Sequence, residues 1–103
     1  MKVVIVGRGR VGKGLSAALR ASDLEVSLRS GRTTLRGIDP DVVVLAVPDA
    51  AIADVAARIA PATSKACVFL HCAGSLGPAA FGAIDRPGGA MHPLVSFANP
   101  SKP

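Results

Sequence analysis

Three glycines near the start of the chain have the spacing of turns that bind phosphate groups. Gly7, Gly9 and Gly12 form the pattern G-x-G-x-x-G directly after residues 3–6, an apolar β-branched run typical of a buried parallel strand. Gly7 would permit a sharp turn, Gly9 would let a pyrophosphate approach the backbone, and Gly12 would let the helix pack close to the strand. This context predicts a dinucleotide site. The alternative is a glycine-rich turn that binds nothing.

Backbone amides after this turn would supply the contacts to phosphate. A helix is predicted over residues 11–20, so the free N–H groups around Arg10 and Val11 would lie at its start. The positive end of the helix dipole lies at the same place and favours an anion. Arg10 and Val11 are therefore included, with the three glycines, among the predicted cofactor-binding residues.

The residues after the second predicted strand bear on the choice of cofactor. That strand covers residues 24–28 and is followed by Arg29, Ser30, Gly31 and Arg32, with no acidic residue in reach. NAD-binding domains usually place Asp or Glu here to accept a hydrogen bond from the ribose 2′-hydroxyl. Arginine and serine suit a 2′-phosphate instead. Arg29, Ser30 and Arg32 thus predict NADP rather than NAD, the alternative being ordinary solvated loop charges.

The rest of the chain continues to alternate strands and helices. Strands are predicted over residues 41–47, 66–71 and 89–91, helices over residues 50–60 and 76–83, and a brief strand or a loop over residues 33–36. This order predicts an α/β fold, a Rossmann-type doubly wound and mostly parallel sheet, in one small domain spanning residues 1–103.

Several later loops should reach the same edge of the sheet as the glycine turn. Val47 and Pro48 end a buried strand there and are expected to line the nicotinamide ribose side. Asp49 is interpreted as the N-cap of the next helix rather than as a catalytic acid. Histidine suits proton transfer near neutral pH, which makes His92 and His71 candidates for acid–base chemistry.

Composition limits the classes of partner. The 103 residues carry a formal net charge of +5 and include no Trp or Tyr, so side chains that stack on nucleic-acid bases are scarce. The longest apolar run, residues 42–47, is far shorter than the roughly 20 residues of a membrane helix. The first strand begins at residue 3, which leaves no room for a leader. We therefore expect a cytoplasmic protein with neither a nucleic-acid nor a membrane partner.

The two cysteines and two histidines lack the spacing of a metal site. Cys67 is predicted to pack in the core, and Cys72 to lie at the end of a strand. A redox role for this pair is the weaker interpretation, because structural disulfides are unusual in a reducing cytosol.

The combination of motifs resembles a known group of proteins. The matching segments are residues 7–12, 43–49, 71–75 and 91–97, which read GRGRVG, VVLAVPD, HCAGS and MHPLVSF. Together they are similar to the Rossmann-like N-terminal domain of NADP oxidoreductases with a DUF2520-type C-terminal domain. That group belongs to the 6-phosphogluconate-dehydrogenase-like superfamily, with prephenate dehydrogenase, pyrroline-5-carboxylate reductase and F420-dependent NADP reductase as relatives. The resemblance covers nearly all of the chain.

The resemblance implies NADP-dependent hydride transfer to or from a small-molecule substrate. By position, His92 and Ser75 match the histidine and serine that serve the substrate hydroxyl in prephenate dehydrogenases; Ser75 could otherwise cap a short helix. Residues 94–97 depart from the prephenate pattern, so the substrate is not carried over. The helical domain that closes the site and forms the homodimer in that superfamily is expected to be absent. The open alternative is a non-catalytic nucleotide-binding or regulatory module.

Overall fold

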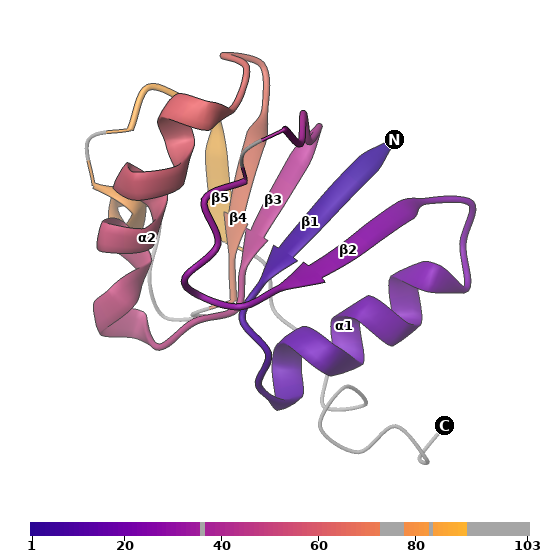
Figure 1. The fold of residues 1–103 in the computed structure, drawn as a ribbon. Coiled ribbons are helices and arrows are strands. Elements are labelled where there is room, and N and C mark those ends of the chain that lie inside the picture. The colour runs from indigo at the N-terminus through magenta and orange to yellow at the C-terminus, as the bar shows by residue number, and fades with distance from the viewer. Residues whose placement is uncertain (36, 73–77, 83, 91–103) are drawn as a thin grey trace.

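Five parallel strands form a single sheet in the computed structural model, which describes residues 1–35, 37–72, 78–82 and 84–90. The strands are β1 (Lys2–Val6), β2 (Glu25–Arg29), β3 (Val42–Leu45), β4 (Val68–His71) and β5 (Gly88–Ala90). They lie in the order β2-β1-β3-β4-β5, and every neighbouring pair is parallel (Figure 1). The predicted Rossmann-like α/β fold in one domain is confirmed.

Two α-helices and three short 3₁₀ segments accompany the sheet in the described residues. They are α1 (Arg10–Arg20), η1 (Asp49–Ala51), α2 (Ile52–Ile59), η2 (Ala60–Ala62) and η3 (Pro78–Phe81). The helix expected over residues 50–60 is therefore present, with 3₁₀ geometry at both of its ends. None of these helices is long and apolar enough to cross a membrane.

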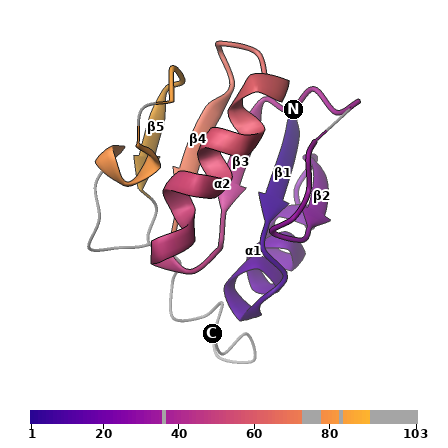
Figure 2. The ribbon, with the colours of Figure 1, turned by 60° about the vertical axis from the view of Figure 1, so that its left-hand side comes forward.

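The two faces of the sheet carry separate cores because successive strand side chains point to opposite faces. Val3 and Ile5 of β1 pack with Leu15 of α1, whereas Val4 and Val6 lie in the core beneath α2. Figure 2 shows α2 lying across β3 and β4, with α1 on the other face. On the α2 side, the rings of Phe69 and Phe81 meet edge to face with their centroids 6.1 Å apart.

The connection from β2 to β3 passes over β1 on the α2 side without regular structure in residues 30–35 and 37–41. Residues 33–35 are thus loop, which settles the alternative left open for that part of the segment. Leu35 holds the connection to the core: its side chain is only 1% exposed and packs with the α2 cluster. Its φ of 57° lies in the left-handed region, which costs a non-glycine residue about 1–3 kcal/mol. Burial of the leucine side chain offsets that strain.

Asp49 does not have the predicted role of helix N-cap. It is already the first residue of η1, the N-cap is Pro48, and no side chain caps either η1 or α2. Pro48 holds φ at −54°, so the chain enters the turn one residue earlier than the capping pattern suggested. The Asp49 carboxylate instead lies in the first turn, where the helix dipole favours negative charge.

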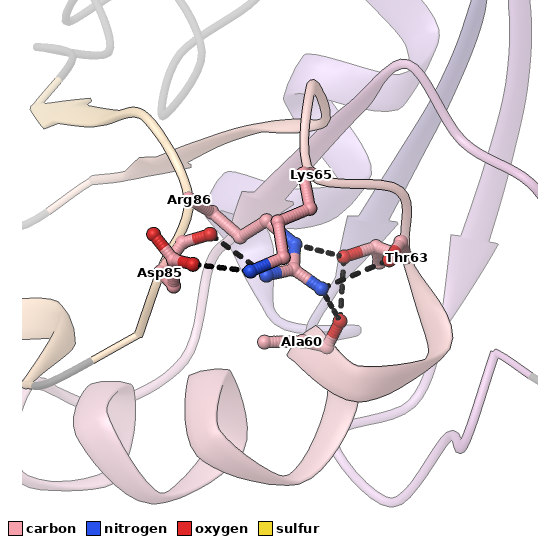
Figure 3. A network of polar contacts seen from close by, with 5 residues as sticks. All are labelled: Ala60, Thr63, Lys65, Asp85 and Arg86. Carbon is pink, nitrogen blue, oxygen red and sulfur yellow. Dashed lines mark hydrogen bonds and ion pairs between the residues drawn. The ribbon is translucent and has the colours of Figure 1, made fainter.

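Arg86 joins the segment before β5 to the end of α2 (Figure 3). Its guanidinium donates to the carbonyl oxygens of Ala60 and Thr63 at 2.8 and 2.9 Å, and to the Thr63 hydroxyl at 3.0 Å. The same hydroxyl donates to the Ala60 carbonyl at 2.7 Å. Carbonyl groups at a helix end lack partners within the helix and lie at the negative end of the dipole. Arg86 therefore caps this end and positions β5.

An exposed ion pair lies beside this network (Figure 3). Lys65 Nζ and Asp85 Oδ2 are 2.5 Å apart, and this hydrogen bond holds the pKa of the Asp85 carboxyl below its usual value. Both side chains are largely exposed, so the pair contributes little to stability. That small contribution is lost as the pH falls through the lowered pKa of Asp85.

Both cysteines are free thiols. Cys67 is buried in the α2-side core, as predicted, and Cys72 is half-buried directly after β4. Burial raises the pKa of the Cys67 thiol from 9.0 to about 11 and also raises the pKa of Cys72. Because the thiolate is the reactive form, neither group is activated near neutral pH.

We expect Arg86→Ala to lower the free energy of unfolding by roughly 1–3 kcal/mol, because the end of α2 loses a charged donor shared by several acceptors. Denaturant titration followed by circular dichroism would measure this change. Arg20→Ala is the control, since the Arg20 side chain is exposed and forms no hydrogen bond or ion pair in the described part of the chain. Equal effects of the two substitutions would contradict the capping role.

We also expect Cys67 to resist thiol reagents in the folded protein at pH 8. The measurement uses Ellman's reagent on Cys72→Ser, which keeps only Cys67, and on Cys67→Ser, which keeps only Cys72. The first variant should react only as fast as it unfolds; prompt reaction would show that Cys67 is not a core residue.

Since folding raises the pKa of the Cys67 thiol from 9.0 to about 11, this thiol's contribution to stability should decline as the pH rises through that interval.

Candidate functional site

The glycine turn between β1 and α1 is packed so closely that two of its glycines have no room for a side chain. A Cβ on Gly7 would lie 2.1 Å from the Ala46 carbonyl oxygen, and one on Gly12 would lie 2.0 Å from the Gly7 carbonyl oxygen. Gly7 also has a φ of +122°, which favours glycine. By contrast, a Cβ on Gly9 would meet nothing within 4 Å. The sharp turn and the close packing predicted from the spacing are both present, and the space beside Gly9 is open.

The N-terminus of α1 opens into this space without a cap. Gly9 is the N-cap, no side chain bonds to the exposed amides, and the first turn holds no acidic residue. The helix ladder begins with the Lys13 amide donating to the Gly9 carbonyl at 3.0 Å. The amides of Arg10 and Val11 precede that bond and have no partner inside the helix. Such a row of amides suits an anion.

Strand register brings the later loops to the same edge. Val6 of β1 is aligned with Arg29 of β2 and Leu45 of β3, and the alignment continues through His71 of β4 to Ala90 of β5. The chain leaves β1 toward α1 on one face, and β3 toward α2 on the other, so β1 and β3 flank the switch point of the sheet. Ligands of open parallel sheets bind outside the strand ends at such a point.

Val47 and Pro48 follow β3 at this switch point. The Ala46 amide donates to the Val6 carbonyl at 2.8 Å, which extends the β1–β3 pairing up to the glycine turn. Val47 is half-buried and Pro48 is exposed. Both residues therefore lie at the edge where the sequence placed them; their contact with a cofactor ribose stays a prediction.

The end of β2 is tied directly to the glycine turn. The Gly7 amide donates to the Arg29 carbonyl at 2.7 Å. Alongside lies an open cleft of about 410 Å³, lined by residues 26–30 together with Arg8 and Arg20. Arg29 and Ser30 thus share one cleft, as expected, whereas Arg32 is exposed and does not line it. Sequence reasoning did not assign Arg8 to this cleft, because its placement depends on pairing between β1 and β2.

Hydrogen bonds hold the loop after β2 in shape. The Thr33 amide donates to the Ser30 carbonyl at 3.0 Å, and the Arg32 amide donates to the Ser30 hydroxyl oxygen at 3.3 Å. Arg58 of α2 reaches across to donate to the Gly31 carbonyl. The loop that carries the candidate arginines is therefore anchored both to itself and to α2.

The cleft is strongly positive. Within the described residues, the ion pairs join Lys2 to Glu25 and Lys65 to Asp85, and neither involves an arginine of the cleft. No acidic side chain lines the cleft. Unpaired guanidinium groups are good ligands for phosphate, which they can bind through two parallel hydrogen bonds.

The structure describes the surroundings of only one of the residues predicted to serve proton transfer or the substrate hydroxyl. Ser75 and His92 lie outside the described residues, so their predicted roles stay predictions. His71 is fully buried at the end of β4, with its ring edge to face with Phe81 at a centroid distance of 5.0 Å. The His71 side chain therefore lies in the protein interior and not in an open site. Among the residues that are described, no three potential metal ligands gather.

Comparisons with known proteins identify similar folds. Neither a scan against protein-family models nor a search of curated proteins finds a match for this chain. Among solved structures, it is similar to a semialdehyde dehydrogenase NAD-binding protein from Cupriavidus necator, in complex with calcium and NAD. The two share 30% identity over 84% of this chain and 36% of that chain, with a TM-score of 0.62.

Two more distant structures show the same fold. A protein from Bacteroides fragilis named an NADP oxidoreductase has 18% identity and a TM-score of 0.72, over 90% of this chain and 44% of that one. A PanE/ApbA family ketopantoate reductase from Ralstonia eutropha has 20% identity and a TM-score of 0.56, over 87% of this chain and 40% of that one. The chain thus spans between 36% and 44% of the length of these proteins.

Alanine substitutions at two glycines of the same turn should differ sharply in their effect on stability. Gly12→Ala places a methyl group 2.0 Å from a backbone oxygen, a clash that outweighs the roughly 1 kcal/mol by which alanine favours a helix. We expect a loss of at least 2 kcal/mol or failure to fold. In Gly9→Ala the added methyl group points into open space, so this variant should melt within a few degrees of the original protein. Thermal denaturation tests both, and an unperturbed Gly12→Ala protein would refute the packing described here.

Proposed function

We propose that this domain binds NADP and serves an oxidoreductase that transfers hydride to or from a small-molecule substrate. The observation that carries the proposal is the glycine turn: Gly7 and Gly12 are required by packing, whereas Gly9 opens onto uncapped helix amides. The similar solved structures support it, since their names describe NAD-binding or NADP oxidoreductase proteins or a ketopantoate reductase. Those names favour an oxidoreductase over a regulatory nucleotide-binding module.

The pyrophosphate would bind at the turn. Gly7, Gly9 and Gly12 shape the backbone there, and the amides of Arg10 and Val11 donate to the phosphate oxygens. The residues fit this group because no atom of the described residues, its chain neighbours aside, lies within 4 Å of a Cβ placed on Gly9, and the first turn of α1 holds no acidic residue. An anion at this end of α1 is also stabilised by the helix dipole.

The 2′-phosphate would bind at the loop after β2. Arg29 and Ser30 line the cleft beside the turn, and Arg32 lies next to them in an anchored loop. No acidic residue occurs among residues 29–32, directly after β2, which favours NADP over NAD because a carboxylate there would repel the added phosphate.

The substrate side of the site would be formed by later loops. Val47 and Pro48 would line the nicotinamide ribose side at the end of β3, and the bound cofactor supplies the hydride chemistry. Ser75 and His92 would hydrogen-bond the substrate hydroxyl, with the His92 imidazole accepting or returning its proton. The roles of Ser75 and His92 rest on the sequence pattern alone.

Calorimetric titration of the full chain with NADPH, NADH and a short DNA duplex tests the proposal. We expect NADPH to bind most tightly and the duplex not to bind. The Arg29→Ala/Arg32→Ala double variant should lose roughly tenfold to a hundredfold in affinity for NADPH with little change for NADH, because charge-assisted hydrogen bonds each contribute about 1.5–3 kcal/mol and exposure reduces that value.

Gly9→Ala is the matched comparison, since a methyl group over the phosphate path should weaken both cofactors without unfolding the protein. Equal weakening of NADPH and NADH in the double arginine variant would rule out the 2′-phosphate assignment. Failure of both dinucleotides to bind the original protein would refute the proposed function itself.

A further inference from the structure

Arg8 lies in the cleft beside β2, although the proposed function gives it no role. It follows Gly7, whose amide donates to the Arg29 carbonyl at 2.7 Å. That bond joins the glycine turn and the end of β2, which are far apart in the sequence. As a result, Arg8 lines the same cleft as Arg29 and Ser30, although it belongs to a different segment of the chain.

The charge in this cleft is unbalanced. Arg8 and Arg29 are both exposed, and no acidic side chain lines the cleft or pairs with either of them in the described part of the chain. Arginine side chains that line one cleft repel each other, and a bound dianion offsets that repulsion. Arg20 adds a third positively charged residue to the lining of the cleft.

We propose that Arg8 is a second specificity-determining residue, which contacts the 2′-phosphate together with Arg29 and Ser30. This inference rests on the proposed function and adds to it. Two arginines approaching from different chain segments can contact different oxygens of one phosphate, and each can form two parallel hydrogen bonds. The non-glycine position between Gly7 and Gly9 would then contribute to cofactor choice through its side chain, while the turn binds the pyrophosphate through its backbone.

The test compares substitutions that each remove one positive charge from the same end of the molecule. Arg8→Gln and Arg29→Gln alter the cleft, and Lys13→Gln removes an exposed charge one turn into α1, outside the cleft. Calorimetry with NADPH and NADH gives the discrimination ratio for each variant. We expect Arg8→Gln to weaken NADPH roughly tenfold and NADH by less than about twofold, with Lys13→Gln close to the original protein.

The fragments 2′,5′-ADP and 5′-AMP provide an independent readout, because they differ only in the 2′-phosphate. Arg8→Gln should weaken 2′,5′-ADP and leave 5′-AMP unchanged. Arg8→Lys, which keeps the charge but loses the planar fork, should lie between the original protein and Arg8→Gln. This conservative variant also provides the test if the glutamine variant fails to fold.

Two results would overturn the inference while leaving the proposed function intact. One is normal NADPH discrimination in Arg8→Gln alongside lost discrimination in Arg29→Gln. The other is equal weakening by Arg8→Gln and Lys13→Gln, which would indicate a diffuse positive field rather than a contact. If the original protein binds neither dinucleotide, the proposed function fails first, and the inference fails with it.

Discussion

The close approach of three backbone segments around Gly7 is the constraint on which the site depends. The carbonyl of Ala46 occupies the position that a Gly7 side chain would need, and the Gly7 carbonyl does the same to Gly12. These contacts pack β1, β3 and α1 around one turn and leave the helix amides exposed beside Gly9. The proposed anion site therefore depends on the same packing that holds the sheet and the helix together.

The shortened connection after β2 gives this small domain its particular shape. Residues 30–35 and 37–41 have no regular structure, where a longer Rossmann half would have a helix and a further strand. Leu35 anchors the loop by its buried side chain, despite a left-handed backbone, and Arg58 holds the Gly31 carbonyl. The loop can therefore be short and still present Arg29 and Ser30 in a defined arrangement at the strand edge.

The arginines of this domain fall into two groups with different surroundings. Arg86 satisfies carbonyl groups at the end of α2 and is used structurally, whereas Arg8 and Arg29 line an open cleft without an acidic partner among the described residues. An arginine with several backbone acceptors stabilises the fold, and an exposed arginine with none is available to a ligand. This difference, rather than the net charge of +5, separates the structural arginine from those proposed to contact a ligand.

Local pattern alone was enough to predict the elements and the turn. The β-branched residues 3–6, the glycine spacing and the alternation of apolar segments predicted the sheet, the start of α1 and the edge that carries the site. These features depend on side-chain period and on backbone freedom, both of which are local. The role of Asp49 was mispredicted because Pro48 is the N-cap and Asp49 is already the first residue of the 3₁₀ turn. The residue types that favour an N-cap do not reveal that the turn begins one residue earlier.

Only the tertiary structure decided which distant residues share a cleft. Arg8 and Arg29 are neighbours because β1 and β2 pair in a register that aligns Val6 with Arg29, and no local pattern contains that register. The same holds for His71, which alternation places at the end of a strand but which lies buried against Phe81, because η3 packs against α2 and β5. The sequence determines the side-chain period of each helix and strand. Which elements lie next to each other depends on the packing of many side chains at once, because no single segment contains that information.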